Sequence, residues 1–277
     1  MSALRPRVLL NFAELELWPA WLLRARSNAV ARQLAGTAWL VRRKTDGLYL
    51  ACLDAQGQTR PIPPLTPGFR QKITLPPLRK ALQRIVRPPQ PLPFHALEKR
   101  LAQLGLDADN YARASGLERM AEPDWLQLAG FDRYRRPLWL APASARAWQR
   151  MQAAARQDGI TLEAVSGYRS HDYQLGIFQR KRACGLAVDA ILQVNAAPGF
   201  SEHHTGRALD ISTPGEPAAE ESFEHTPAFA WLCDNAAQFD FHLSYPRNNP
   251  HGICYEPWHW CHAPITPHHE HNIALPH

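Results

Sequence analysis

Two short stretches of the sequence, SEHHTGRALDIS and YEPWHW, combine histidine with acidic residues. They contain five candidates for metal or proton chemistry, which are His203, His204, Asp210, Glu256 and His259. A catalytic zinc ion usually has three protein ligands drawn from His and Asp or Glu, with a fourth position left for water. A pair from the first stretch and one histidine from the second would complete such a set.

The spacing within each stretch favours particular ligands. If His203 enters from a loop and Asp210 lies in the strand-like segment ALDIS, Gly206 allows the sharp turn that brings both side chains to one point. In the second stretch Pro257 interrupts a strand ladder, so Glu256 and His259 need not face opposite sides. We therefore expect the two stretches to converge on one cation.

The same residues predict a hydrolytic reaction. Peptide hydrolysis at a zinc site requires a group that carries a proton from the attacking water to the leaving amine, and a carboxylate close to the metal can do this. Glu256 is the candidate for this role. Arg169, in the segment SGYRS, could stabilise the negative charge that develops on the carbonyl oxygen.

A mixed framework must position these side chains. Apolar residues recur at helical spacing in several segments, one of which starts at a serine and stops at a glycine, and other segments are strand-like. Helices are expected at residues 95–106, 144–159, 171–185 and 227–239, and strands at 160–170, 207–212, 241–246 and 254–262. Because the regular alternation of a doubly wound sheet is missing, we predict an α+β fold in which helices are mixed with antiparallel-looking strands.

The first ninety residues are expected to form a smaller, basic domain. An apolar, helix-like stretch runs to about Arg32, and the apolar segments on either side of KTDG predict a β-hairpin. Prolines then concentrate at residues 61–69 and 87–94, which predicts a boundary between residues 86 and 95. The expected domains are 1–90 and 95–277.

Charge is distributed unevenly along the chain. Residues 1–100 contain 17 Lys and Arg against 5 Asp and Glu, whereas the remainder contains 14 against 20. A basic region of this kind attracts polyanions such as nucleic acid, anionic lipid or an anionic wall polymer. The alternative is a solvated basic face with no partner.

Cysteine content and hydropathy bear on the compartment. The five cysteines, an odd number without a CxxC pair, predict free thiols. No apolar run reaches the roughly 18 residues that a membrane-spanning helix needs. The N-terminal apolar stretch carries Glu14 and Glu16 and lacks a signal-peptide cleavage pattern, so the sequence predicts no export and a cytoplasmic location.

Together the motifs resemble a known family. SGYRS, Gln174, SEHHTGRALDI and YEPWHW, in this order, are similar to those of the VanY-type D-alanyl-D-alanine carboxypeptidases, over about residues 95–263. The resemblance implies an α+β fold with a central antiparallel sheet and flanking helices, which these zinc peptidases share with the amino-terminal signalling domain of hedgehog proteins. It also implies a location at the cell envelope, in contrast to the missing export signal.

The resemblance implies a role for each motif residue. One Zn²⁺ per chain would be bound by His203, Asp210 and His259, with Glu256 as general base and Arg169 at the transition state or substrate. Residues expected to contact substrate are Tyr168, Gln174, Ser201, His204 and Trp258. Two positions depart from the family pattern: His204 replaces a common glutamine, and Cys261 replaces a frequent basic residue.

These observations predict a zinc carboxypeptidase that removes D-alanine from peptidoglycan stem peptides or from muropeptides. One alternative is a peptidoglycan endopeptidase with the same site. The other is a polyanion-binding protein that acts through the basic residues 1–90. The histidine-rich segment after residue 263 is expected to be an exposed end, and the sequence does not predict an oligomeric state.

Overall fold

Seven strands form an antiparallel sheet in which distant parts of the chain pair, in the order β5-β4-β3-β2-β1-β6-β7. The computed structural model describes residues 6–25, 27–61 and 78–263, so most of the predicted proline segment 61–69 and the histidine-rich tail lie outside the described residues. The strands of this sheet are β1 (Val8–Asn11), β2 (Leu15–Pro19), β3 (Trp39–Arg43), β4 (Tyr49–Leu53), β5 (Thr59–Pro61), β6 (Trp125–Phe131) and β7 (Pro137–Leu140).

The N-terminal part differs from its sequence prediction in one element. The stretch predicted as a helix up to Arg32 instead forms β1 and β2, and the helix that follows, α1, covers only Asn28–Leu34. The reason is a partner that local pattern cannot reveal: β1 pairs with β2 on one side and with β6 on the other. The predicted hairpin around KTDG is confirmed by β3 and β4.

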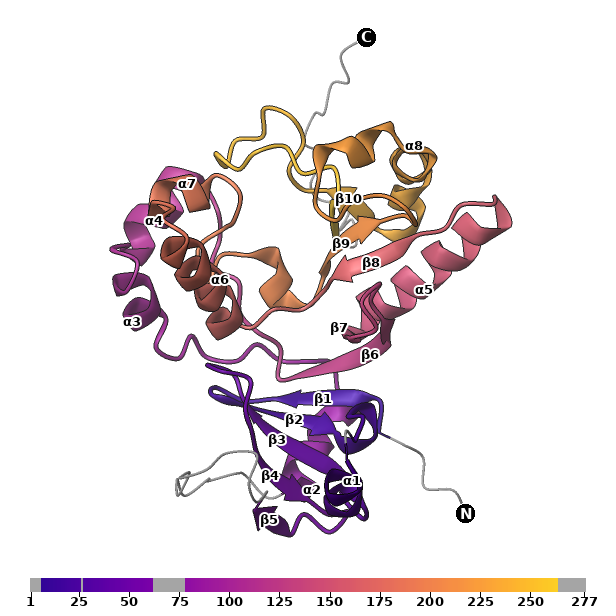
Figure 1. Cartoon of the computed structure of the whole chain (residues 1–277). Helices are drawn as coiled ribbons and strands as arrows, with labels where there is room; N and C mark the ends of the chain where they lie inside the picture. The colour runs from indigo at the N-terminus through magenta and orange to yellow at the C-terminus, as the bar shows by residue number, and fades with distance from the viewer. Residues whose placement is uncertain (1–5, 26, 62–77, 264–277) are drawn as a thin grey trace.

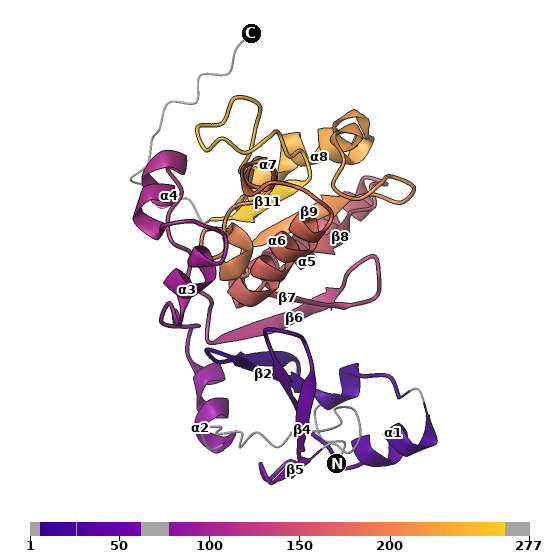
Figure 2. The same ribbon diagram turned by 60° about the vertical axis from the view of Figure 1, so that its left-hand side comes forward.

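The two predicted domains therefore contribute strands to one sheet. Strands β1–β5 come from the first 61 residues, and β6 continues the same sheet beyond β1. Figure 2 shows β6 between the N-terminal strands below it and the helices above it. The division of the chain near residue 90 stays a prediction, but residues on both sides of it share hydrogen-bonded structure.

A second, four-stranded antiparallel sheet has the order β10-β11-β9-β8. Its strands are β8 (Glu163–Ser166), β9 (Ala208–Ser212), β10 (Phe241–Leu243) and β11 (His259–His262). The remaining helices are α2 (Leu78–Leu82), α3 (Leu97–Ala102), α4 (Ala108–Ser115), α5 (Pro142–Gln157), α6 (His171–Ala183), α7 (Val188–Leu192) and α8 (Pro227–Asn235). Short 3₁₀ turns are η1 (Ala20–Leu22), η2 (Gln83–Val86), η3 (Glu202–Thr205), η4 (Glu221–His225) and η5 (Ala236–Phe239). The α+β class with antiparallel sheets and flanking helices is confirmed.

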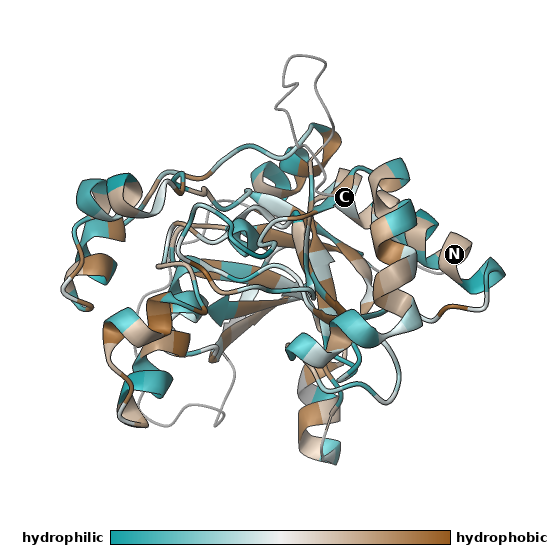
Figure 3. Ribbon diagram, turned by 90° about the horizontal axis from the view of Figure 1, so that it is seen from above, coloured by the Kyte–Doolittle hydropathy of each residue, from teal (hydrophilic) through white to brown (hydrophobic). Residues whose placement is uncertain are grey.

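Helix α5 fills the space between the two sheets (Figure 1). Its Trp148 and Met151 are fully buried in a core that also includes Leu140 of β7 and Trp260 of β11. Truncating a buried tryptophan typically costs about 3–5 kcal/mol, so this core contributes substantially to holding the strands in position. In Figure 3 apolar residues lie along the central strands, and hydrophilic residues mark many outer helix faces.

The start of α5 also differs from its prediction. The predicted serine cap, Ser144, lies inside the helix, which begins at Pro142 after Ala141. Proline suits the first helical turn because the missing amide hydrogen has no intrahelical partner there. The Ser144 hydroxyl is instead fully buried and lies 3.2 Å from Nδ1 of His262 in β11.

Ion pairs between the first hundred residues and the rest of the chain account for part of the uneven charge. The basic residues Lys44, Arg84, Arg87 and Arg100 lie in the first hundred residues, and their acidic partners are Glu122, Asp124 and Asp172. The excess positive charge of the N-terminal part thus meets carboxylates from the rest of the chain. This portion of the basic charge is used inside the protein rather than being available to a polyanion.

The five cysteines are free, as predicted, with Cys52 and Cys261 buried and the other three exposed. No helix within residues 6–25, 27–61 and 78–263 combines the length and the apolar character needed to cross a membrane.

Candidate active site

The second sheet brings the two histidine stretches together. Asp210 of β9 and His259 of β11 are direct cross-strand partners, although 49 positions separate them in sequence. His203 lies in η3, just before β9. The turn between them closes at Gly206, whose φ is +69° and where a Cβ would lie 2.4 Å from a Leu126 side-chain carbon. A glycine is therefore required at this turn, as the sequence predicted.

Three ligand-type side chains converge at this point. Oδ1 of Asp210 lies 3.2 Å from Nε2 of His203 and 3.2 Å from Nδ1 of His259. The ligand atoms of these three residues all lie within 4.8 Å of one another, and all three side chains are buried. Two imidazoles and one carboxylate make up a donor set that suits zinc.

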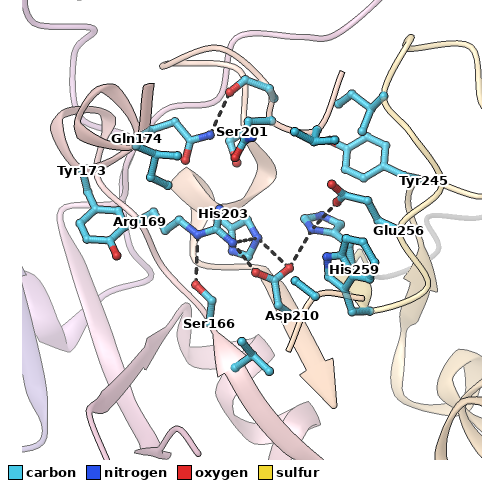
Figure 4. Close-up of a pocket in the computed structure, with 18 of the residues that line it drawn as sticks. Ser166, Arg169, Tyr173, Gln174, Ser201, His203, Asp210, Tyr245, Glu256 and His259 are labelled. Carbon is cyan, nitrogen blue, oxygen red and sulfur yellow. Dashed lines mark hydrogen bonds and ion pairs between the residues drawn. The ribbon is translucent and has the colours of Figure 1, made fainter. Parts of the chain in front are cut away.

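Figure 4 shows the side chains of His203 and His259 meeting at Asp210, and each histidine also has a partner on its far side. Nδ1 of His203 donates to the Gly167 carbonyl oxygen at 2.7 Å, and Nε2 of His259 donates to Oε2 of Glu202 at 2.9 Å. Because a carbonyl or carboxylate oxygen accepts, the opposite nitrogen of each ring is the one available to a metal. Both of those nitrogens face Asp210.

The electrostatics of the two rings differ. Burial and the positive charge of Arg169 lower the pKa of His203 to about 4. Burial also opposes a charge on His259, but its hydrogen bonds to Asp210 and Glu202 raise the pKa of this ring to about 10. In the metal-free protein His259 therefore carries a proton at neutral pH, and a metal ion has to displace it.

Arg169 contacts the same cluster. One guanidinium nitrogen lies 2.9 Å from Nε2 of His203 and forms an ion pair with Asp210. Its Nε donates to the Ser166 hydroxyl at 3.0 Å. Together with His203, Arg169 holds the pKa of the Asp210 carboxyl well below its usual range, despite the burial that opposes ionisation. Asp210 is thus an anion that is ready to bind a cation.

Glu256 lies next to this cluster, on the loop before β11. The predicted strand 254–262 is confirmed only from His259 onward, because Pro257 lies in a turn. The His259 amide donates to the Glu256 carbonyl oxygen at 3.0 Å, and this turn places the Glu256 carboxylate 3.8 Å from Nδ1 of His259. Burial raises the pKa of Glu256 to about 7, so the group can exchange a proton near neutral pH.

A cavity of about 400 Å³ opens over these groups. The predicted residues Arg169, Gln174, Ser201 and Trp258 line it, along with the three ligand-type residues and Glu256. Sequence reasoning missed other lining residues, among them Arg136, Lys181, Asn195 and Tyr245. Nothing in the local sequence marks these residues, because they reach the cavity from separate loops and helices.

Two residues predicted to contact substrate lie elsewhere. His204 is fully buried and does not line the cavity. Its Nδ1 donates to the Arg169 carbonyl oxygen at 2.7 Å, and its Nε2 accepts from the Gly199 amide at 3.0 Å. Tyr168 is also outside the lining, and its hydroxyl donates to Glu122 at 2.7 Å. The structure therefore gives both residues the geometry of supports for the loop that carries Arg169, and their contact with a substrate stays a prediction.

A buried network of hydrogen bonds and an ion pair holds the loop that carries Arg169 in place. The Glu122 carboxylate accepts from the Tyr168 hydroxyl at 2.7 Å and from the His171 amide at 2.8 Å, on either side of Arg169. Lys44, from the turn after β3, forms an ion pair with the same carboxylate. The N-terminal part of the chain thus supplies the positive charge beneath the candidate active site, which sequence reasoning did not foresee.

The part of the chain that carries this cluster is similar to known proteins. Residues 137–265, which include the whole cluster, match the VanY family, described as D-alanyl-D-alanine carboxypeptidase. Over 151 residues the chain is 30% identical to the bifunctional D-Ala-D-Ala dipeptidase and D-Ala-D-Ala carboxypeptidase VanXYC of Enterococcus gallinarum, covering 52% of this chain and 76% of that protein. This chain belongs to the VanY family.

Other relatives of this VanY-family chain match it over shorter shares of their length. YodJ of Bacillus subtilis (strain 168) is 38% identical over 127 residues, which are 44% of this chain and 45% of YodJ. The chain thus spans less than half the length of that relative. Among solved structures, the LdcB LD-carboxypeptidase is 34% identical over 48% of this chain and 64% of its own, with a TM-score of 0.44.

Proposed function

We propose that this chain is a zinc-dependent carboxypeptidase that removes D-alanine from peptidoglycan stem peptides or muropeptides. The proposal is carried by one observation: the ligand atoms of His203, Asp210 and His259 meet within 4.8 Å in a cavity that Glu256 and Arg169 also line. Membership of the VanY family supports it.

The proposed ligands fit one zinc ion. Nε2 of His203, Nδ1 of His259 and an oxygen of Asp210 provide two neutral donors and one negative charge, and each imidazole is oriented by a hydrogen bond on its far side. Zinc in such a site acts as a Lewis acid, polarising a carbonyl oxygen and lowering the pKa of a coordinated water.

The chain's own residues would perform the proton transfers. Glu256 accepts a proton from the attacking water and passes it to the leaving amine, a role that suits a buried carboxyl whose pKa is raised to about 7. Arg169 provides positive charge in the same cavity for the oxygen that becomes negative as water attacks.

The lining of the cavity supports a substrate that ends in a carboxylate. Among its described lining residues, Arg136, Arg169 and Lys181 are cationic. Gln174 donates its amide hydrogen to the Ala196 carbonyl oxygen at 2.9 Å, while its own Oε1 is buried and has no partner among the described residues. We propose that this oxygen accepts from a peptide N–H of the substrate, because a buried acceptor without a partner is costly.

The test combines metal analysis with product analysis. Zinc-loaded protein is incubated with tri-, tetra- and pentapeptide stems, and the products are identified by mass. We expect at least one zinc per chain and release of free D-alanine. Glu256→Gln should retain zinc but lower kcat by about 10²–10⁴-fold, the usual contribution of a general base.

Glu221→Gln is the matched control, because its carboxylate is exposed and lies outside the cavity lining. It should leave turnover unchanged. Protein that binds zinc but releases D-alanine from none of the stems contradicts the proposal. Products cut inside the peptide would assign the site to an endopeptidase instead.

A further inference from the structure

A second group of potential metal ligands lies on the same face of the second sheet. His259 and Cys261 are two residues apart in β11, so their side chains point to the same side of the strand. Cys261 pairs directly with His242 of the neighbouring strand β10. The row of side chains that begins with Asp210 and His259 therefore continues to Cys261 and His242 at the edge of the sheet.

Glu202, the first residue of η3, completes this second group of potential ligands. Its carboxylate accepts from Nε2 of His259 at 2.9 Å and also lies close to the Cys261 thiol. The ligand atoms of Glu202, His242 and Cys261 all lie within 4.8 Å of one another. Cys261 is only 3% exposed, whereas the side chain of Glu202 is 19% exposed and His242 is exposed. The group thus has a buried sulfur and an outer side that is open to solvent.

These distances are close to those of a bound transition metal. Zinc lies about 2.0–2.3 Å from N, O and S donors, so donors around a tetrahedral ion are about 3.3–3.8 Å apart. From separations of up to 4.8 Å, the donor atoms would have to approach one another by up to about 1.5 Å. His242 can make this movement by side-chain rotation, because it is exposed and lies in an edge strand.

The types of the donors select the kind of metal. A thiolate, an imidazole and a carboxylate suit zinc and similar transition metals, whereas magnesium and calcium prefer oxygen donors alone. Glu202 and an ionised Cys261 would supply two negative charges to a divalent cation. Arg207, which is exposed nearby, contributes an opposing positive charge.

We propose that Glu202, His242 and Cys261 form a second binding site for a transition metal such as Zn²⁺, next to but separate from the candidate active site. The two sites share one link, because Glu202 also holds His259.

The second site should be the weaker of the two. Its three donors belong to one buried, one half-buried and one exposed side chain, whereas the three ligand-type side chains of the candidate active site are all buried. The second equivalent of metal is therefore expected to bind after the first. A titration can resolve the two steps.

Cobalt is a suitable probe, because a thiolate ligand gives Co²⁺ a charge-transfer absorption in the near ultraviolet. The candidate active site has only nitrogen and oxygen donors, and histidine binding elsewhere on the chain cannot produce this band. Metal-free full-length protein is titrated with Co²⁺ in a background where the exposed Cys184, Cys233 and Cys254 are serine. This background removes the accessible thiols outside the second site.

We expect the band to develop with a second equivalent of Co²⁺. Cys261→Ser should abolish the band and lower the stoichiometry by one, while the first equivalent still binds. His242→Asn, at an exposed position, should weaken the second step by about tenfold or more, since changes even around a metal ligand usually cost 10–100-fold in affinity.

The result does not depend on the proposed peptidase activity, because the band reports a thiolate ligand and not turnover. A parent protein that binds one equivalent and develops no band would overturn the second site. A band that persists unchanged in His242→Asn or in a folded Cys261→Ser protein would overturn the assignment of its ligands. If Cys261→Ser fails to fold, the His242 variant decides the question.

Discussion

Replacing Lys44 with methionine should destabilise the protein and weaken its active site, although Lys44 lies outside the cavity. The ion pair between Lys44 and Glu122 is buried, with only 1% and 6% of the two side chains exposed. Methionine keeps much of the length of the side chain but removes its charge. Glu122 would then remain as a buried anion without its main counter-charge.

The size of the effect follows from this burial. Removing one partner of a buried ion pair usually costs 3–5 kcal/mol, because the other charge is left without compensation. Glu122 keeps hydrogen bonds from Tyr168, from the His171 amide and from Asn11, so we expect a loss of about 3 kcal/mol, at the lower end of that range. A typical domain has about 5–15 kcal/mol of stability, so the change should be readily measured.

Catalysis should fall as well. Glu122 holds the loop on both sides of Arg169, and small displacements of a catalytic group can cost about 10²-fold in rate. We expect kcat/KM for a stem peptide to fall by about 10- to 100-fold under conditions where the variant is still folded.

The assay is urea denaturation of the parent, Lys44→Met, Glu122→Gln and the double variant, followed by activity measurements. The double variant should lose less unfolding free energy than the two single variants lose in sum, because it removes both charges together. Arg43→Met is the matched control, since its ion pair with Asp46 is exposed and should be worth about 0–1 kcal/mol. If Lys44→Met loses no more stability than Arg43→Met, the argument from the buried pair is refuted.

Three further predictions follow from the same structure. The pKa of Glu122 is lowered well below its ordinary 4.5, mainly by Lys44 against the opposing effect of burial, so its contribution to stability is complete above that pH and is lost as the pH falls below it. Thermal denaturation across this acid range should therefore show a steeper loss for the parent than for Glu122→Gln, and parallel curves would contradict the assignment. Gly206→Ala should cost about 2 kcal/mol more than Gly215→Ala in urea denaturation, because both glycines have positive φ but only Gly206 has neighbours within 4 Å, and equal losses would mean that the turn is not tightly packed. Deleting residues 1–90 leaves β6 without its partner β1 and Glu122 without Lys44, so size-exclusion chromatography should show aggregation of the remaining chain, and a stable monomer would support an independent domain at residues 95–277.

Much of the candidate site could be predicted because its chemistry depends on residue types in short stretches. His203, Asp210 and His259 have ligand side chains, Glu256 lies three positions from one of them, and Gly206 is required where the chain turns sharply. Such features survive in the sequence because each depends on the residue itself or on its near neighbours. Their convergence in the structure agrees with that reading.

Several elements could not be predicted for the opposite reason. The stretch that contains β1 and β2 has enough apolar residues for a helix, and it becomes strand because β6, over a hundred residues later, pairs with it. Ser144 reads as a helix cap, but its hydroxyl lies against His262 of a distant strand. In both cases the deciding contact is far away in sequence.

The sequence by itself determined which side chains can bind a metal, carry a proton or allow a tight turn, because these are properties of single residues and short spacings. Only the tertiary structure decided where those side chains point. It turned His204 and Tyr168 away from the cavity, placed Lys44 under the active site, and set Cys261 beside His242 and Glu202. The physical reason is that orientation depends on strand pairing and on the burial of polar groups against distant segments, and neither is encoded in local pattern.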